Sequence, residues 1–350
     1  MKNTGVATVA QLSEYTEIID ARTPSEYAED HIPGAINLPV LDDEERARVG
    51  TLHKQVSAFE AKKAGAALVS RHIADHLERY FAAKPVGYKP LIYCWRGGNR
   101  SGAMAHVLQK IGFKAGQLDG GYKNYRRTVV AELDTLPARL GFRVICGPTG
   151  CGKSRLLQAL QAKGAQVLDL EALAAHRGSL LGDLPNQPQP GQKWLESSIW
   201  WQLKQFDPAR PVFVESESRK IGRLRVPDAL LAAIRSGRSI WLEVAMEHRI
   251  KLLLEEYAHF LSSPETLLEQ ISLLSPLRGH ETVERWNELI RQRRWAEFVQ
   301  DMLENHYDPA YRKSLGKNYG ERADNFEFTL SGTSPGDFDR LADAILEKIA

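Results

Sequence analysis

The stretch FRVICGPTGCGKSRLLQAL, from Phe142 to Leu160, decides the fold of the second half of the chain. An apolar run ends at Cys146, a glycine-rich loop follows, and a segment with helical periodicity begins at the Lys-Ser pair. The loop has the pattern of a complete Walker A motif: a glycine, four further residues and then Gly-Lys-Ser, placed between a strand and a helix. The backbone N–H groups of such a loop hold a chain of phosphates. The stretch therefore predicts a phosphate-binding α/β domain.

The side chains around this loop have separate expected roles. Lys153 reaches terminal phosphate oxygens, and the hydroxyl of Ser154 suits a magnesium ion. Glu215, after a neighbouring apolar run, is the expected second magnesium ligand, with Glu217 as the alternative. The basic run SRKIGRLR follows directly and is expected to face phosphates rather than form an ordinary solvated surface. The predicted diphosphate-binding residues are Gly147, Gly150, Cys151, Gly152, Lys153, Ser154, Arg219 and Arg223.

A second loop of unusual composition lies in LIYCWRGGNRSGAMAHVL, from Leu91 to Leu108. Cys94 ends an apolar run, two glycines let backbone N–H groups turn inward, and a helix begins near Ser101. Arginine side chains add fixed positive charge, which favours the nucleophilic thiolate over the thiol. A small buried hydrophobe is the alternative role for this cysteine. The candidate anion-binding residues are Arg96, Gly97, Gly98, Asn99, Arg100 and Ser101, and the candidate catalytic residues are Cys94, Arg96, Arg100 and Lys153.

Length and composition limit the class of protein. A chain of 350 residues suggests about two domains, and a net charge of +2 identifies no anionic partner. The three cysteines argue against a disulfide framework and fit a reducing compartment. The N-terminus lacks the features of a signal peptide, and no apolar run approaches the ~20 residues of a membrane span. A cytoplasmic protein without a membrane partner is expected.

Alternating strands and helices predict parallel sheets in both halves. Three tryptophans at helical spacing, Trp194, Trp200 and Trp201, are expected to be core residues, with the wall of an apolar ligand pocket as the alternative. The expected organisation is a first domain over 1–128, a linker over 129–140, a P-loop domain over 141–265, a helical segment over 266–320, and a strand and helix over 321–350 that complete the P-loop domain.

Three stretches of the first half together resemble a rhodanese domain. They are DARTPSEYAEDHIPGAINLP (Asp20 to Pro39, upstream of Cys94), CWRGGNRSG and LDGGYKNYR. Rhodaneses carry sulfur as a cysteine persulfide. The spacing from Cys94 to Arg100, with five residues between them, is also that of cysteine phosphatases and is one residue longer than the usual rhodanese loop. The upstream motif favours the rhodanese fold, and the longer loop has room for a phosphorus centre or for an atom larger than sulfur.

With GPTGCGKS, LDLEALAAHRGS, VFVESESRKIG and HYDPAYRKS, the resemblance covers nearly the whole chain and is to the bacterial tRNA 2-selenouridine synthase family. The resemblance implies a rhodanese-like parallel-sheet domain followed by a P-loop NTPase-like α/β domain with a helical segment. It implies a tRNA with 2-thiouridine at the wobble position as substrate. It further implies that geranyl diphosphate first alkylates that sulfur and that selenium from selenophosphate then replaces the geranylated sulfur.

The same resemblance implies roles for the two loops. Selenophosphate would be held by the loop after Cys94, with the cysteine as nucleophile and selenium carrier; the Walker A residues by themselves predict Mg²⁺ at the P-loop. A selenophosphate-supplying enzyme is an expected partner, and the helical segment 266–320 is the candidate tRNA contact. An ATP-dependent tRNA sulfurtransferase or kinase with a rhodanese module is the principal alternative; an RNA-binding adaptor and a phosphatase are weaker ones.

Overall fold

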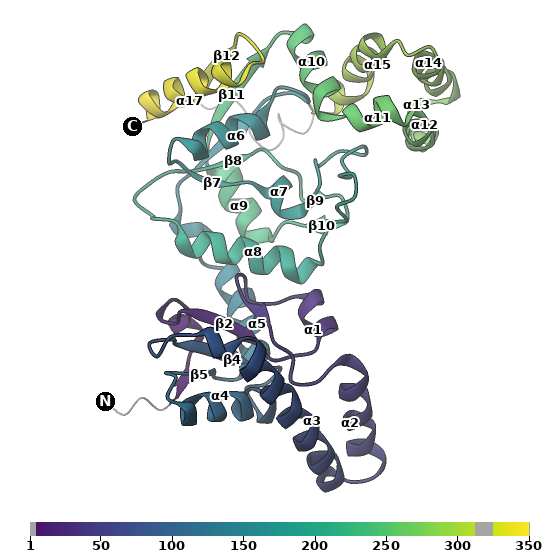
Figure 1. The fold of residues 1–350 in the computed structure, drawn as a ribbon. Helices are drawn as coiled ribbons and strands as arrows, with labels where there is room; N and C mark the ends of the chain where they lie inside the picture. The colour runs from purple at the N-terminus through teal and green to yellow at the C-terminus, as the bar shows by residue number, and fades with distance from the viewer. Residues whose placement is uncertain (1–4, 312–324, 350) are drawn as a thin grey trace. The chain divides into compact units, whose positions relative to one another are not determined.

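The computed structural model describes residues 5–311 and 325–349. Residues 312–324, which include parts of the expected segments 266–320 and 321–350, lie outside the described residues, as do the ends at 1–4 and 350. Two compact units are present: Met1–Glu132 with Gly191–Trp201, and Leu133–Pro190 with Gln202–Ala350. Each has its own parallel sheet (Figure 1), which confirms the predicted α/β class.

In the first unit the sheet has the order β1-β5-β4-β2-β3 with every pairing parallel. Its strands are β1 (Val6–Ala7), β2 (Glu17–Asp20), β3 (Ile36–Asn37), β4 (Pro90–Tyr93) and β5 (Gly116–Leu118). Its helices are α1 (Pro24–Glu29), α2 (Asp43–Gln55), α3 (Ala58–Arg79), α4 (Asn99–Ile111) and α5 (Gly121–Leu133). Buried side chains of β2 and β4 pack against α3 and α4 to form the core. The carboxyl ends of β2 and β4 therefore bring Asp20 and Cys94 to one edge of the sheet.

In the second unit the sheet has the order β12-β11-β6-β8-β7, again with every pairing parallel. Its strands are β6 (Phe142–Cys146), β7 (Gln166–Leu168), β8 (Val212–Glu215), β11 (Arg238–Val244) and β12 (Phe326–Leu330). Beside it lie α6 (Lys153–Ala162), α7 (Leu170–Ala174), α9 (Asp228–Ser236) and α17 (Pro335–Ile349), with a hairpin of β9 (Lys220–Ile221) and β10 (Leu224–Arg225). The C-terminal strand β12 pairs with β11, and α17 packs on α6, so the end of the chain belongs to the P-loop sheet.

Between β11 and β12 the chain forms a group of helices with a separate apolar core. They are α10 (Met246–Glu256), α11 (Ala258–Ser262), α12 (Pro264–Ser272), α13 (Ser275–Arg278), α14 (His280–Arg291), α15 (Trp295–Met302) and a π-helical turn (Leu303–Tyr307). Exposed arginines here pair with acids of the same group: Arg291 with Glu284, and Arg294 with Glu297. Among the described residues no helix is long and apolar enough to cross a membrane.

Helix α8 (Gln192–Gln205) begins in the first unit, because Gly191–Trp201 packs there. Trp200 is 2% exposed, its ring centre lies 5.6 Å from that of Tyr125, and its indole donates a hydrogen bond of 2.8 Å to Glu132. Trp200 is therefore a core residue of the first unit, as its helical spacing predicted. The ring of Trp194 lies 4.3 Å from that of His31, also within the first unit.

Candidate active sites of the two units

In the first unit the candidate nucleophile lies at the junction of β4 and the loop before α4. Cys94 is 3% exposed, and the hydroxyl of Ser101 donates a hydrogen bond of 3.1 Å to its Sγ. Because α4 begins at Asn99, the positive end of a 13-residue helix faces the same loop. A sulfur anion here would have a hydroxyl donor and a helix N-terminus beside it.

The loop keeps its shape through contacts with the strand and helix that follow. Gly97 has φ +64°, and a Cβ there would meet the carbonyl of Leu118 at 2.7 Å. The amide of Gln117 donates hydrogen bonds to the carbonyls of Gly97 and Gly98 at 2.7 and 3.1 Å, and to Ser101 Oγ at 2.9 Å. Gln117 was not singled out in the sequence because its role depends on a pairing between β5 and β4.

The two arginines of the loop differ in their surroundings. Arg100 is half-buried and donates hydrogen bonds of 2.7 and 3.3 Å to the carboxylate of Glu26 on α1. Burial alone would raise the pKa of Glu26, but hydrogen bonds from Arg100 and from the backbone of Thr23 hold it below its ordinary value. Arg96 is exposed and has no ion-pair partner among residues 5–311 and 325–349. It is the more accessible cation for an incoming anion.

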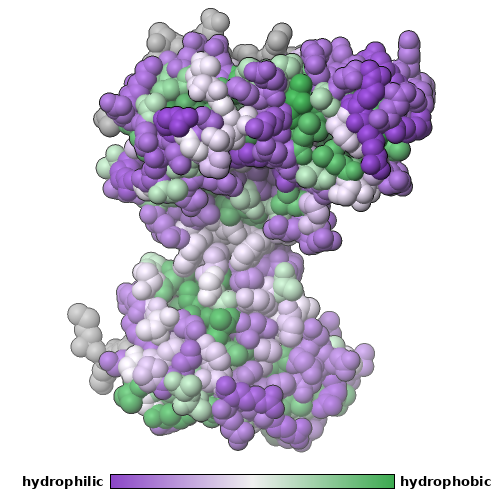
Figure 2. Space-filling view, turned by 45° about the horizontal axis from the view of Figure 1, so that its top comes forward, coloured by the Kyte–Doolittle hydropathy of each residue, from purple (hydrophilic) through white to green (hydrophobic). Residues whose placement is uncertain are grey.

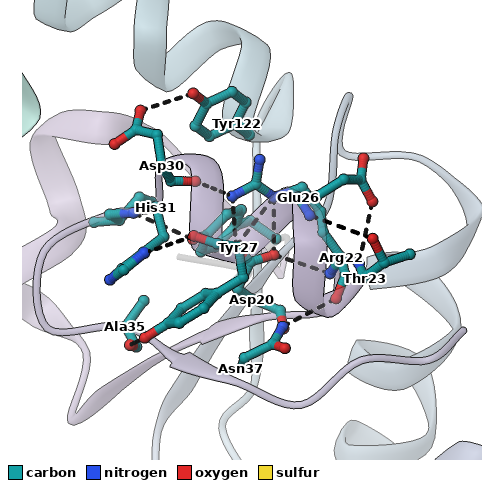
Figure 3. Close-up of polar contacts among 12 residues, drawn as sticks. Asp20, Arg22, Thr23, Glu26, Tyr27, Asp30, His31, Ala35, Asn37 and Tyr122 are labelled. Atoms are coloured by element: carbon teal, nitrogen blue, oxygen red, sulfur yellow. Dashed lines mark hydrogen bonds and ion pairs between the residues drawn. The ribbon is translucent and has the colours of Figure 1, made fainter. Parts of the chain in front are cut away.

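A buried polar network supports this edge of the sheet (Figure 3). Arg22 is 1% exposed. It donates hydrogen bonds to the carboxylate of Asp20, the shortest of which is 2.6 Å long, and one of 2.6 Å to the carbonyl of Asp30. Its guanidinium lies 3.9 Å from the ring centre of Tyr122, whose hydroxyl donates to Asp30 at 2.7 Å. The ring of Trp95, next to the nucleophile, is 5.3 Å from that of Tyr122. This network ties the DARTPSEY segment to the loop.

In the second unit the Walker A loop joins β6 to α6. Gly150 and Gly152 have φ +78° and +77°, a conformation that L side chains rarely adopt. Lys153 Nζ donates hydrogen bonds of 3.0 and 3.5 Å to the carbonyls of Gly147 and Pro148. Burial disfavours its charge, yet the neighbouring Cys151 and Tyr311 and two glutamates together raise the pKa of Lys153 above its ordinary value. The lysine is therefore a cation held at the loop.

A cluster of acids faces the loop, and its members differ in position. Ser154 Oγ donates a hydrogen bond of 3.1 Å to Glu171 Oε2. Glu215, the expected metal ligand, is buried with Oε1 accepting hydrogen bonds of 2.9 and 3.0 Å from the backbone N–H groups of Leu170 and Glu171. Glu217 lines the same cavity as Glu171. The structure thus puts Glu171, rather than Glu215, in contact with Ser154.

The charge state of this cluster suits a divalent cation. Burial, with the charge of Glu171 next to it, raises the pKa of Glu217 to about 8. Burial raises the pKa of Glu171 as well. The raised pKa values mean that the positive charge near these two carboxyls is too small to keep both ionised at neutral pH. A bound divalent cation would lower both pKa values and stabilise both carboxylates. With the Ser154 hydroxyl, they form an all-oxygen donor set of the kind that Mg²⁺ takes.

The cations of this cavity are not those of the basic run. The cavity has an internal volume of about 630 Å³, and Lys153, Arg155 and Arg177 line it. Arg219 instead pairs with Asp228 at 2.9 Å, and Arg223 donates from its backbone to Gln189 at 2.9 Å. Arg219 and Arg223 thus have acceptors away from the Walker A loop, on α9 and in the segment before α8.

Arg177 belongs to the AAHRGS motif and approaches the cavity from the segment after α7. Its guanidinium lies 4.8 Å from the ring centre of Tyr257, and its Nη1 is buried without a hydrogen-bond partner among the described residues. A buried guanidinium nitrogen with no acceptor costs free energy unless an anion completes it. Arg177 is therefore positioned to receive phosphate oxygens.

The HYDPAY motif returns to the Walker A loop from the far end of the helical group. Asp308 accepts hydrogen bonds of 2.6 and 3.0 Å from Arg249, whose Nε donates to the carbonyl of Thr149 at 2.9 Å. Tyr311 hydrogen-bonds to Ser216 at 2.7 Å, and Lys153 Nζ lies 5.1 Å from its ring centre. The sequence marked this motif without giving it a role, because only the chain's return path brings it to the loop.

Comparisons with known proteins agree with the division of the chain into two units. Residues 140–271 match the family model described as the tRNA 2-selenouridine synthase AAA domain, and residues 6–128 match the rhodanese-like domain. A tRNA 2-selenouridine synthase of Nitrosomonas europaea is 36% identical over 282 residues, which cover 79% of this chain and 71% of that relative. One of Alcanivorax borkumensis is 32% identical over 337 residues, covering 87% of this chain and 91% of the relative.

Proposed function

The chain belongs to the tRNA 2-selenouridine synthase family of transferases, and on that premise we propose that its two units divide one reaction sequence between them. The P-loop unit transfers the geranyl group of geranyl diphosphate to the sulfur of wobble 2-thiouridine in tRNA. The rhodanese unit supplies selenium from selenophosphate, which replaces the geranylated sulfur. One observation supports the proposal: the chain has two glycine-containing loops that each lead into a helix N-terminus, one centred on a thiol and one on a lysine.

At the P-loop, the 2-thiouridine sulfur attacks C1 of the geranyl group. The C–O bond breaks, diphosphate leaves with the electron pair, and the proton of the thiouridine passes to solvent. Lys153 and Arg177 are the residues that would stabilise the charge developing on diphosphate. Ser154, Glu171 and Glu217 would hold Mg²⁺, which when bound neutralises diphosphate charge as a Lewis acid.

At the rhodanese loop, electron counting restricts the role of Cys94. Selenium is at the selenide level in selenophosphate and in 2-selenouridine, so a Cys94 perselenide would require an added oxidant. Attack of the Cys94 thiolate on phosphorus requires none: an S–P bond forms, the P–Se bond breaks, and hydroselenide leaves with the electron pair. Water then hydrolyses the S–P bond, and hydroselenide displaces geranylthiolate from C2 of the base. The spacing from Cys94 to Arg100, which is shared with cysteine phosphatases, supports attack of the thiolate on phosphorus.

Nucleoside analysis of 2-thiouridine tRNA tests the proposal. The full chain with geranyl diphosphate alone should yield S-geranyl-2-thiouridine, and addition of selenophosphate should convert it to 2-selenouridine. Replacing geranyl diphosphate by ATP should yield no product; a product that depends on ATP would overturn the proposal in favour of a sulfurtransferase. Mass spectrometry of the acid-quenched Cys94 peptide should find phosphate on sulfur; selenium there instead would contradict the phosphorus attack.

A further inference from the structure

Trp95, the residue after the candidate nucleophile, is a large aromatic side chain that the fold leaves 37% exposed. Figure 2 shows apolar and hydrophilic surface interspersed over the first unit, so exposure alone does not mark a site. Trp95 differs from other exposed side chains in its support. Its ring centre lies 5.3 Å from that of Tyr122, at an interplanar angle of 32°. The indole is therefore a partly exposed ring that rests on another ring beside Cys94.

The ring that supports the indole is itself fixed. Tyr122 is buried, its hydroxyl donates a hydrogen bond of 2.7 Å to Asp30, and the guanidinium of Arg22 lies over its ring (Figure 3). The backbone of Trp95 is also held, because its carbonyl accepts a hydrogen bond of 2.9 Å from the N–H group of Lys123 in the first turn of α5. An aromatic ring that is ordered in this way loses little side-chain freedom when a further ring stacks on it.

Two cations lie on the helix whose first turn holds Trp95. Lys123 and Arg127 are four residues apart on α5, which puts them on one face of the helix, and both are exposed. Neither has an ion-pair partner among residues 5–311 and 325–349. Arg126, by contrast, is largely buried and pairs with Glu196. The exposed face of α5 therefore carries two positive charges that no acid of the described chain pairs with.

An ordered aromatic ring beside unpaired cations is the combination with which proteins bind single-stranded RNA, the ring stacking on a base and the cations contacting phosphates. We infer that Trp95, Lys123 and Arg127 form an RNA-binding surface beside Cys94. The indole stacks on the base that receives selenium, and Lys123 and Arg127 contact phosphates of the same anticodon loop. The inference rests on the proposed function and adds to it where the tRNA is bound.

The position of Trp95 in the chain gives the stack a purpose. In the proposed reaction hydroselenide is released at Cys94, so the base must be held at that loop before the selenium escapes to solvent. A base in a single-stranded loop is unstacked at low cost and can turn onto an aromatic side chain. Stacking on the residue next to the nucleophile would hold the base where hydroselenide forms.

The helical segment that the sequence marked as the tRNA contact is a weaker candidate in the part that the structure describes. Its exposed Arg291 pairs with Glu284, and Arg294 pairs with Glu297. An RNA phosphate would have to displace an acid from either arginine, whereas Lys123 of α5 requires no such exchange.

Binding of synthetic anticodon stem-loops to the full chain tests the stack, without geranyl diphosphate or selenophosphate. The RNA carries S-geranyl-2-thiouridine at the wobble position, or S-methyl-2-thiouridine as the form without the long hydrocarbon chain. Trp95→Ala should weaken binding of both RNAs about 10-fold, the loss of one stacked base, and Trp95→Phe should recover most of that loss. Phe59→Ala, at an aromatic side chain of the same unit that is 68% exposed, is the matched control and should bind as wild type does.

The salt dependence of binding separates the cations from the ring. Lys123→Ala and Arg127→Ala should each reduce the slope of log affinity against log salt concentration by about 0.7, which corresponds to one phosphate contact on a single strand. Trp95→Ala should leave this slope unchanged. Arg291→Ala is the matched control for loss of a charge and should alter neither the slope nor the affinity. Thermal melting verifies that each variant is folded.

The inference would be overturned by wild-type affinity in folded Trp95→Ala, or by wild-type salt slopes in both α5 variants. An effect of Trp95→Ala on the S-geranyl RNA alone would also overturn it, because the indole would then contact the hydrocarbon chain rather than the base. So would a larger loss for Arg291→Ala than for either α5 variant. The expected binding losses, in a protein whose wild type makes no 2-selenouridine, would instead refute the proposed reaction and leave the RNA-binding surface standing.

Discussion

Arg100 of the Cys94 loop and Glu26 of α1 form a half-buried ion pair, with guanidinium-to-carboxylate distances of 2.7 and 3.3 Å. Glu26 also accepts a hydrogen bond from the backbone of Thr23 at the start of α1. The pair therefore fixes the orientation of the loop arginine relative to the segment that defines the rhodanese motif. A guanidinium held on one side presents its remaining N–H groups in a fixed direction.

Glu26→Gln should reduce kcat/KM for selenophosphate about 10-fold, and Arg100→Lys about 100-fold, because lysine has no planar fork. If the glutamate acts through the arginine, the double variant should be no worse than Arg100→Lys alone. Conversion of S-geranylated tRNA to 2-selenouridine tRNA measures these effects. Glu44→Gln on the exposed side of α2 is the control; fully additive losses would contradict a positioning role.

Cys94→Ser should abolish selenium incorporation and leave geranylation intact, since the two reactions use different loops. Ser101→Ala removes the hydroxyl that donates to Cys94 Sγ and should slow selenium incorporation about 10-fold, the cost of roughly one hydrogen bond to a charged group. Single-turnover assays of each half-reaction measure both effects. Selenium incorporation at the wild-type rate by Cys94→Ser would exclude the cysteine as nucleophile.

In the P-loop unit, Lys153→Ala should reduce geranylation at least 100-fold, and Arg177→Ala should raise KM for geranyl diphosphate about 10-fold. Arg219→Ala should change neither constant by more than about twofold, because Arg219 pairs with Asp228 and does not line the cavity. Steady-state geranylation kinetics distinguish these outcomes. A larger loss for Arg219→Ala than for Arg177→Ala would restore the basic run as the phosphate site.

Magnesium binding should release a proton near neutral pH, because the pKa of Glu217 is raised to about 8 and a bound cation requires the ionised carboxylate. Calorimetry in two buffers of different ionisation enthalpy measures this proton, which Glu217→Gln should eliminate. Without metal, the native state holds a proton that the unfolded chain releases between the ordinary glutamate pKa and about 8. Stability therefore falls as pH rises through that window, by up to a few kcal/mol. Stability independent of pH there would contradict the raised pKa of Glu217.

Local sequence predicted the parts of this protein whose chemistry is contained in one segment. The Walker A loop needs glycines at positive φ, a lysine and a serine within eight residues, and all of these occur between Gly147 and Ser154. Likewise Cys94, the two loop glycines and Ser101 belong to one strand–loop–helix junction, with Ser101 in the first turn of α4, so their proximity follows from that pattern. Strand and helix alternation then predicted both parallel sheets.

Contacts between distant segments were decided by the tertiary structure. The basic run with Arg219 resembles a phosphate site in sequence, but Arg219 pairs with Asp228; Arg177, which the sequence marked only as part of the AAHRGS motif, lines the cavity instead. Glu215 has the expected place after a strand, but the N-terminus of α7 takes up its carboxylate, and Glu171 contacts Ser154. Sequence alone thus determined two strand–loop–helix segments with glycine-containing loops and their order along the chain. Only the fold determined which charges and apolar side chains surround them, because helix packing and strand order bring in residues from other segments, 100 positions away in the case of Arg249 and Thr149.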